Sequence, residues 1–275
     1  MTTDGAIETG TLPSGHPYAR IGSGSRMVLY IPGLSFSADV PTPKSVARSW
    51  KAWLGPIEQH DLTFVQVGRR ADLRPGSSAA DVADDYASVI LDQWGSAVGV
   101  MGISTGGGYA QFLASRHPEL VDRMVLGFTA HRITADVRDR QRRAVDHFLA
   151  GRWRTGFALF GPWFMPKHPR LGSAVTWLLG PYLVGTYADL RVLRIDADSD
   201  DAFDATDQLD AIRCPTLVVS GGLDMAYPRD VVREMVAGLP NVRHIEYPGV
   251  SHTGPGAAFA HDACAFLAAQ LPSVP

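Results

Sequence analysis

A serine between two glycines is the first candidate for chemistry in this chain. Gly102-Ile103-Ser104-Thr105-Gly106 fits the pattern G-x-S-x-G, which is weak alone because glycine and serine are common residues. An apolar run precedes the pattern and a helix-like stretch follows it directly, as a nucleophile elbow requires. We therefore expect Ser104 to stand on a sharp turn at a helix N-terminus, where free N–H groups favour developing negative charge.

A serine hydroxyl needs a base to become a nucleophile, and the base needs an orienting carboxylate. Two later stretches supply both in the order Ser, acid, His that such elbows use. Asp224 follows the apolar run TLVVSGG, and His252 lies in a turn after RHIEYPG. Each of these residues alone could be an ordinary turn residue. Together they predict Ser104 as nucleophile, His252 as general base and Asp224 as orienting acid.

Attack on a carbonyl also needs fixed N–H donors for the oxygen that becomes negative. One donor would be the backbone N–H of Thr105. The second is expected from the loop after the apolar run RMVLYIPG. Pro32 cannot donate, so the Leu34 N–H is the candidate, with Ser35 as a possible side-chain contributor.

The elements that must position these residues are predicted from nearly continuous apolar runs, which are typical of strands covered on both faces. Helical patterns lie between most of the runs, which predicts a parallel sheet with helices on both faces. The expected strands are 26–33, 62–68, 97–104, 123–129, 215–222 and 243–249, and the expected helices are 44–54, 77–94, 106–116, 228–238 and 256–270.

The stretch 131–210 breaks this alternation, because no buried strand is evident in it. We interpret it as a helical cap over the sheet's C-terminal edge, inserted into a core domain made of 1–130 and 211–275. An ordinary pair of packing helices is the alternative. The many carboxylates from Asp196 to Asp210 are interpreted as a solvated run, so Asp224 is preferred as the acid.

Composition excludes several classes of function. The chain has 275 residues, of which 45% are hydrophobic and 19% charged, and its net charge of −3 offers no basic field for nucleic acid. Cys214 and Cys264 belong to no metal or redox pattern. The polar N-terminus is unlike a signal peptide, and no window reaches the ~18 consecutive apolar residues of a membrane span. We expect a cytoplasmic monomer or homodimer that needs no metal or cofactor, binds no membrane and takes a small-molecule substrate.

From about 16 to 270 the chain resembles the α/β-hydrolase family, particularly its cap-bearing serine hydrolases. The likeness lies in the PGL loop, the segment VGRRADLRPGSS, the elbow, the GGLD acid and the GVSHTG histidine. It implies a mostly parallel central sheet flanked by helices, with a helical cap inserted after the sixth strand. It also implies the triad and oxyanion-hole roles given above. Pro32 stands where many members have histidine, and Pro75 where relatives often have glycine.

The expected reaction is hydrolysis of a small, largely apolar ester, thioester or lactone through an acyl-enzyme. A carbon–carbon bond hydrolase, a small-substrate amidase or peptidase, a cofactor-free perhydrolase and an acyltransferase stay open on the same triad. A ligand-binding receptor with little turnover is the alternative of another class. The residues predicted to line the substrate pocket are Ser35, His131, Trp153, Phe160, Trp163 and Phe164.

Overall fold

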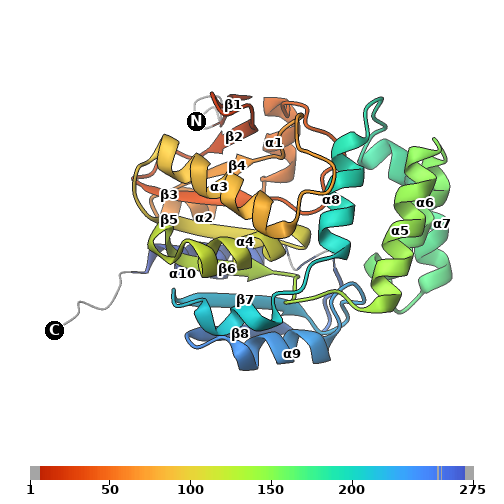
Figure 1. The fold of residues 1–275 in the computed structure, drawn as a ribbon. Helices are drawn as coiled ribbons and strands as arrows, with labels where there is room; N and C mark the ends of the chain where they lie inside the picture. The colour runs from red at the N-terminus through yellow and green to blue at the C-terminus, as the bar shows by residue number, and fades with distance from the viewer. Residues whose placement is uncertain (1–6, 253, 255, 270–275) are drawn as a thin grey trace.

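The strands form one eight-stranded sheet in a computed structural model that describes residues 7–252, 254 and 256–269 (Figure 1). The order across the sheet is β1-β2-β4-β3-β5-β6-β7-β8. Strands β3 to β8 pair in parallel, whereas β2 is antiparallel to both β1 and β4. The strands are β1 Ile7–Thr11, β2 Pro17–Ile21, β3 Arg26–Ile31, β4 Leu62–Val67, β5 Val98–Ile103, β6 Val121–Gly127, β7 Thr216–Gly221 and β8 Val242–Tyr247.

Each of the six predicted strands is present, and the parallel sheet flanked by helices is confirmed. The hairpin of β1 and β2 was not predicted. Its sequences, IETGT and PYARI, mix polar and apolar residues and carry a proline and a glycine, so they lack the continuous apolar run that marked the other strands.

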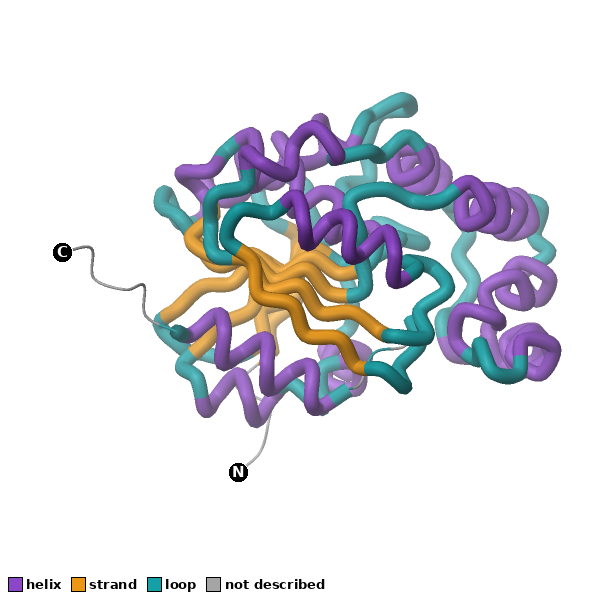
Figure 2. The backbone as a smooth tube through the Cα atoms, turned by 90° about the horizontal axis from the view of Figure 1, so that it is seen from below, coloured by secondary structure: helices purple, strands orange, loops and turns teal. Residues whose placement is uncertain are grey.

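Helices cover both faces of the sheet (Figure 2). Helices α3, α4 and α9 contribute to one hydrophobic cluster, while residues of α1, α2 and α10 belong to the other. The predicted helix 44–54 ends early, at Ser49, and a second helix that was not predicted begins at Leu54. The bounds are α1 Pro43–Ser49, α2 Leu54–Gln59, α3 Ala79–Gln93, α4 Thr105–Arg116, α9 Arg229–Gly238 and α10 Ala257–Ala268, with short 3-10 helices at Pro118–Leu120 and Thr206–Ala211.

Four helices lie between β6 and β7 and make up the helical insertion, residues 131–210. They are α5 Ala135–Leu149, α6 Trp153–Phe164, α7 Pro169–Leu183 and α8 Arg191–Asp201. In Figure 1, α8 runs along the end of the sheet, and α5, α6 and α7 lie beyond it. The only β-pairing described within the insertion is the isolated bridge between Arg132 and Asp204.

The prediction of a solvated acidic run from Asp196 to Asp210 is wrong for three of its carboxylates, whereas Asp198, Asp204, Asp207 and Asp210 are exposed as expected. Asp196, Asp200 and Asp201 are buried on α8, with 0%, 3% and 4% of their surface exposed. Val192, Leu193 and Ile195 are buried on the same helix, so its inward face carries carboxylates beside apolar side chains. These carboxylates are paired with Arg69, Gln141 and Arg142 instead of with water. Charge in sequence therefore did not mean exposure, because the partners come from distant segments.

In the part of the chain that the structure describes, no helix is both long and apolar enough to cross a bilayer. The same residues contain no group of three or more His, Cys, Asp or Glu side chains arranged to hold a metal ion.

Candidate active site

Ser104 occupies the turn between β5 and α4, in a strained backbone conformation with φ 53° and ψ −127°. Its N–H donates to the Gly127 carbonyl at 3.0 Å, and its carbonyl accepts from the Gly107 N–H at 2.8 Å. A Cβ on Gly106 would lie 2.2 Å from the Ile31 carbonyl oxygen, and one on Gly102 would lie 2.5 Å from the Gly106 oxygen. The glycines of the pattern are thus required by close backbone approach.

Gly107 and Gly108 extend the glycine run into α4, and close packing accounts for both. A Cβ on Gly107 would lie 2.3 Å from the Thr129 side chain, and one on Gly108 would lie 3.0 Å from the Phe203 ring.

The three residues predicted to act together form one hydrogen-bonded chain at the C-terminal ends of β5, β7 and β8. Ser104 Oγ lies 3.1 Å from His252 Nε2, and His252 Nδ1 lies 2.9 Å from Asp224 Oδ2. The Asp224 side chain is 1% exposed and the His252 side chain 13%. Asp224 Oδ1 accepts from the N–H groups of Ala226 and Tyr227 at 2.8 and 3.1 Å, which fixes the carboxylate toward the imidazole.

The loop after β3 lies beside the serine. A Cβ on Gly33 would be 3.3 Å from Ser104 Cβ and 3.8 Å from its Oγ. Leu34 follows directly, and Thr105 is the first residue of α4, so its N–H has no partner within the helix. The Ser35 N–H donates to Asp196 Oδ2 at 2.8 Å and is therefore not free to bind a ligand.

Two of the six predicted pocket residues touch the histidine loop from the insertion. The His252 N–H donates to the Trp163 carbonyl at 3.3 Å, and Ser251 Oγ donates to the Phe164 carbonyl at 3.0 Å. The Trp163 ring lies edge-on to the imidazole, with centroids 6.2 Å apart. The C-terminal end of α6 therefore supports the loop that carries the base.

Two more of the predicted pocket residues belong to an aromatic cluster inside the insertion. Phe160 stacks on Trp163 with ring centroids 4.8 Å apart, and Trp153 packs against Phe148 at 5.3 Å. Phe36, which follows the loop beside Ser104, joins the cluster at 5.2 Å from Phe148. The cluster ties the insertion to the core next to the candidate oxyanion loop.

The contacts of His131 lie elsewhere, against α9. Its Nε2 is 3.7 Å from Glu234 Oε2, and the side chain is buried. Burial, together with the nearby Arg132 charge, lowers its pKa, so the neutral ring is favoured. These contacts give no support to the prediction that His131 lines a substrate pocket.

A cavity of about 470 Å³ adjoins His252 on the side of the site formed by core residues. None of the six predicted pocket residues is part of its lining, which includes Pro32, Trp50, Trp53, Phe128 and Phe259. This cavity was not predicted from sequence because its walls come from six separate segments that carry no shared motif.

Tyr227 is a further residue that the sequence analysis missed. Burial raises its pKa well above the ordinary value, while the Ser104 and Thr129 hydroxyls act in the opposite direction through hydrogen bonds. Its ring lies beside the imidazole of His252, with centroids 5.7 Å apart. A neutral phenol therefore packs under the serine and the histidine. The available signal was its place three residues after Asp224, in the turn closed by that carboxylate.

Asp200 accepts from Gln141 Nε2 at 2.8 Å and is also hydrogen-bonded to the side chain of Thr105, the residue after Ser104 in the elbow. Burial, together with the charges of Asp196 and Asp201, raises the pKa of Asp200 to about 7, although hydrogen bonds from Gln141 and Thr105 act in the opposite direction. The folded protein therefore holds this proton over a pH range in which an unfolded aspartate, with a pKa of about 3.9, has lost it.

Stability should accordingly fall as pH rises from about 4 to about 7, the window between the two pKa values. The Asp200→Asn side chain is neutral at every pH, so the variant lacks this pH-dependent contribution to stability. Between pH 5 and pH 8 we expect the wild type to lose about 2 kcal/mol more unfolding free energy than the variant, measured by urea titration at both pH values. The exposed Asp210→Asn is the control and should follow the wild type. Parallel pH profiles for wild type and Asp200→Asn would contradict the assignment.

The sequence and the fold can be compared with those of known proteins. No family model matches the sequence, and no characterised protein is similar enough in sequence to count as a relative. Solved structures do match. MGS-M2, an α/β-hydrolase enzyme from a Medee basin deep-sea metagenome library, superposes with a TM-score of 0.78 at 16% identity, covering 97% of this chain and 99% of its own.

Two further matches have activities in their names. The enol-lactonase from Burkholderia xenovorans LB400 gives a TM-score of 0.70 at 17% identity, over 94% of this chain and 99% of its own. An esterase from Exiguobacterium antarcticum gives 0.72 at 17% identity, over 95% and 99%. The strand order of the sheet, the turn at Ser104 and these superpositions agree on one fold. The chain has the α/β-hydrolase fold.

Proposed function

We propose that this protein is a serine hydrolase that cleaves a small, largely apolar ester, thioester or lactone through an acyl-enzyme. The observation that carries the proposal is the hydrogen-bonded chain from Ser104 Oγ through His252 to the buried Asp224. A buried carboxylate facing Nδ1 leaves Nε2 as the acceptor of the serine proton, which is the arrangement a general base needs.

In the proposed cycle, Ser104 Oγ attacks the substrate carbonyl carbon while His252 Nε2 takes the hydroxyl proton. The carbonyl oxygen becomes an oxyanion, which the N–H groups of Leu34 and Thr105 stabilise. His252 then gives its proton to the leaving oxygen or sulfur, and the acyl-enzyme forms. Water, deprotonated by His252, attacks the acyl carbon, and collapse of the second intermediate returns the proton to Ser104. These steps require no metal or cofactor.

The substrate class follows from the surroundings of the triad. The cavity beside His252 has walls of tryptophan and phenylalanine, which suit an apolar acyl or alcohol group. An esterase and an enol-lactonase share the fold, which is consistent with ester and lactone substrates. The helical insertion would act as a cap, since its α6 contacts the histidine loop.

A fluorophosphonate probe and a substrate panel test the proposal. The probe should label one residue, Ser104, as located by peptide mass spectrometry. Short p-nitrophenyl esters, a thioester and a lactone should turn over, and pretreatment with the probe should abolish that turnover.

Other outcomes of the panel would redirect the assignment. Labelling at another residue would contradict the assignment of Ser104 as the nucleophile. Turnover confined to amides, to carbon–carbon bonds of diketones or to peroxide-dependent perhydrolysis would favour the alternatives on the same triad. Ester formation with an added alcohol in place of hydrolysis would indicate an acyltransferase. Stoichiometric labelling without turnover of any substrate would favour a ligand-binding receptor.

A further inference from the structure

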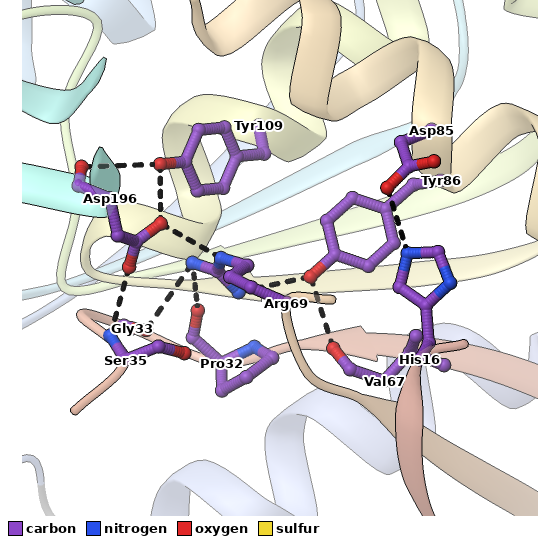
Figure 3. A network of polar contacts seen from close by, with 10 residues as sticks. All are labelled: His16, Pro32, Gly33, Ser35, Val67, Arg69, Asp85, Tyr86, Tyr109 and Asp196. Carbon is purple, nitrogen blue, oxygen red and sulfur yellow. Dashed lines mark hydrogen bonds and ion pairs between the residues drawn. The ribbon is translucent and has the colours of Figure 1, made fainter. Parts of the chain in front are cut away.

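Arg69 is a charged side chain buried next to the candidate site, with 1% of the side chain exposed. Its Nε donates to Asp196 Oδ1 at 2.9 Å, and its Nη1 donates to the Tyr86 hydroxyl at 3.0 Å (Figure 3). Its Nη2 donates to the carbonyl oxygens of Pro32 and Gly33 at 2.9 and 3.3 Å. One nitrogen of the guanidinium, Nη2, therefore binds the backbone of the loop that lies beside Ser104.

Asp196 engages the same loop from α8 of the insertion. Its Oδ1 accepts from Arg69 Nε and from the Tyr109 hydroxyl, the latter at 2.6 Å, and its Oδ2 accepts from the Ser35 N–H at 2.8 Å. The carboxylate is fully buried. The loop is thus held by its carbonyl groups before Leu34 and by its amide after Leu34 (Figure 3).

These contacts decide the direction of the Leu34 N–H. The Gly33 carbonyl and the Leu34 N–H belong to one planar peptide unit, in which the two groups point in opposite directions when the bond is trans. The described residues contain no cis peptide bond. Because Arg69 binds the Gly33 oxygen, the Leu34 N–H points away from Arg69. Gly33 itself lies against Ser104, since a Cβ on it would be 3.3 Å from Ser104 Cβ, and the Leu34 N–H follows it in the same loop.

We propose that Arg69 and Asp196 are positioning residues for the oxyanion hole: together they lock the Gly33–Leu34 peptide so that its N–H faces the carbonyl oxygen under attack. The inference rests on the proposed function. It also gives α8 a part in the site, because the hole is incomplete without a carboxylate supplied by the insertion. A planar guanidinium suits this task, since it binds carboxylate, hydroxyl and carbonyl groups in fixed directions at once, which an ammonium does not.

The first test compares Arg69→Lys and Asp196→Asn with Tyr109→Phe. The first two disturb groups that bind the loop, whereas the third removes one hydroxyl from the same buried network without touching the loop. For the loop-binding variants we expect kcat to fall about 10²-fold with KM little changed, because a small misplacement of an oxyanion donor costs that much. Tyr109→Phe should keep kcat within about threefold of the wild type.

Inhibition by an alkylboronic acid distinguishes a misplaced oxyanion donor from a general loss of structure at the site. It forms a tetrahedral adduct on Ser104, so its inhibition constant should rise in parallel with the loss of kcat. The inhibition constant of the planar carboxylic acid product should stay nearly constant. Folding is checked by circular dichroism and thermal unfolding. Unchanged kcat in folded variants, or a change confined to KM, would overturn the proposal.

A backbone substitution covers the case in which neither charged variant folds. Replacing Ser35 by its α-hydroxy acid removes the N–H that Asp196 binds and leaves the ion pair intact, and the same exchange at Ser37 is the control. We expect kcat to fall about tenfold at position 35 only. Equal kcat values for the proteins with a backbone ester at position 35 and at position 37 would overturn the proposal. If turnover survives Ser104→Ala, the proposed function itself fails, which is a separate result.

Discussion

Replacing Ser104 by alanine should lower kcat about 10⁶-fold, to a residual rate from binding and the oxyanion donors alone. The expected loss is large because the hydroxyl is the only group in the hydrogen-bonded chain that can form the acyl-enzyme. The strained turn should survive, since alanine is no bulkier than serine. The measurement is steady-state hydrolysis of a p-nitrophenyl ester, with single-turnover mixing to show that no acyl-enzyme burst remains.

Ser220→Ala is the matched control. The Ser220 hydroxyl also pairs with a histidine, His244 Nε2 at 2.8 Å, but it lies within β7 instead of on an elbow. Its loss should leave kcat within about threefold of the wild type. Turnover retained in Ser104→Ala, or lost in Ser220→Ala, would move the nucleophile away from the elbow.

Replacing Asp224 by asparagine should lower kcat about 10⁴-fold, as the same exchange does in a serine-protease triad. The asparagine amide would face His252 Nδ1 with a donor, which favours the tautomer whose Nε2 carries the proton and cannot accept another. The Asp224 oxygen that receives the Ala226 and Tyr227 N–H groups has an equivalent in asparagine, so the turn should fold as before. KM should change little.

The exposed Asp230→Asn, at the start of α9, is the control and should behave as the wild type. Thermal unfolding of both variants checks that the loss is chemical. A near-normal rate in Asp224→Asn would point to a different carboxylate, with the buried Asp200 as the first to examine because it is hydrogen-bonded to the side chain of Thr105, the residue after Ser104.

The parallel part of the sheet was predictable because most of its strands are largely buried and read as nearly continuous apolar runs, although the edge strand β8 is only partly buried. The strand ends then placed Ser104, Asp224 and His252 at one edge, and the structure brings these three side chains together. Local sequence sufficed for each residue, since Ser104 follows β5 directly and Asp224 and His252 lie in the loops that follow β7 and β8.

Features that depend on distant partners were not predictable from one sequence. Asp196 looks like one member of an acidic run until Arg69, 127 positions away, is seen beside it. The cavity beside His252 combines residues from separate segments, and none of them carries a motif. Tyr227 becomes significant only when the turn after Asp224 folds it under the serine.

The place of Asp196 on α8 bears on how this protein can be recombined with others. A chimera that exchanges residues 131–190 for the corresponding segment of another hydrolase keeps the α8 carboxylate and its bond to the Ser35 N–H. An exchange of 131–210 discards that anion and leaves the Arg69 charge buried without its counter-ion. A graft that ends before Arg191 therefore keeps the Asp196 contacts to the loop. It also removes Gln141 and Arg142, the α5 partners of the buried Asp200 and Asp201, so the contacts of α8 are kept whole only when α5 is retained with it.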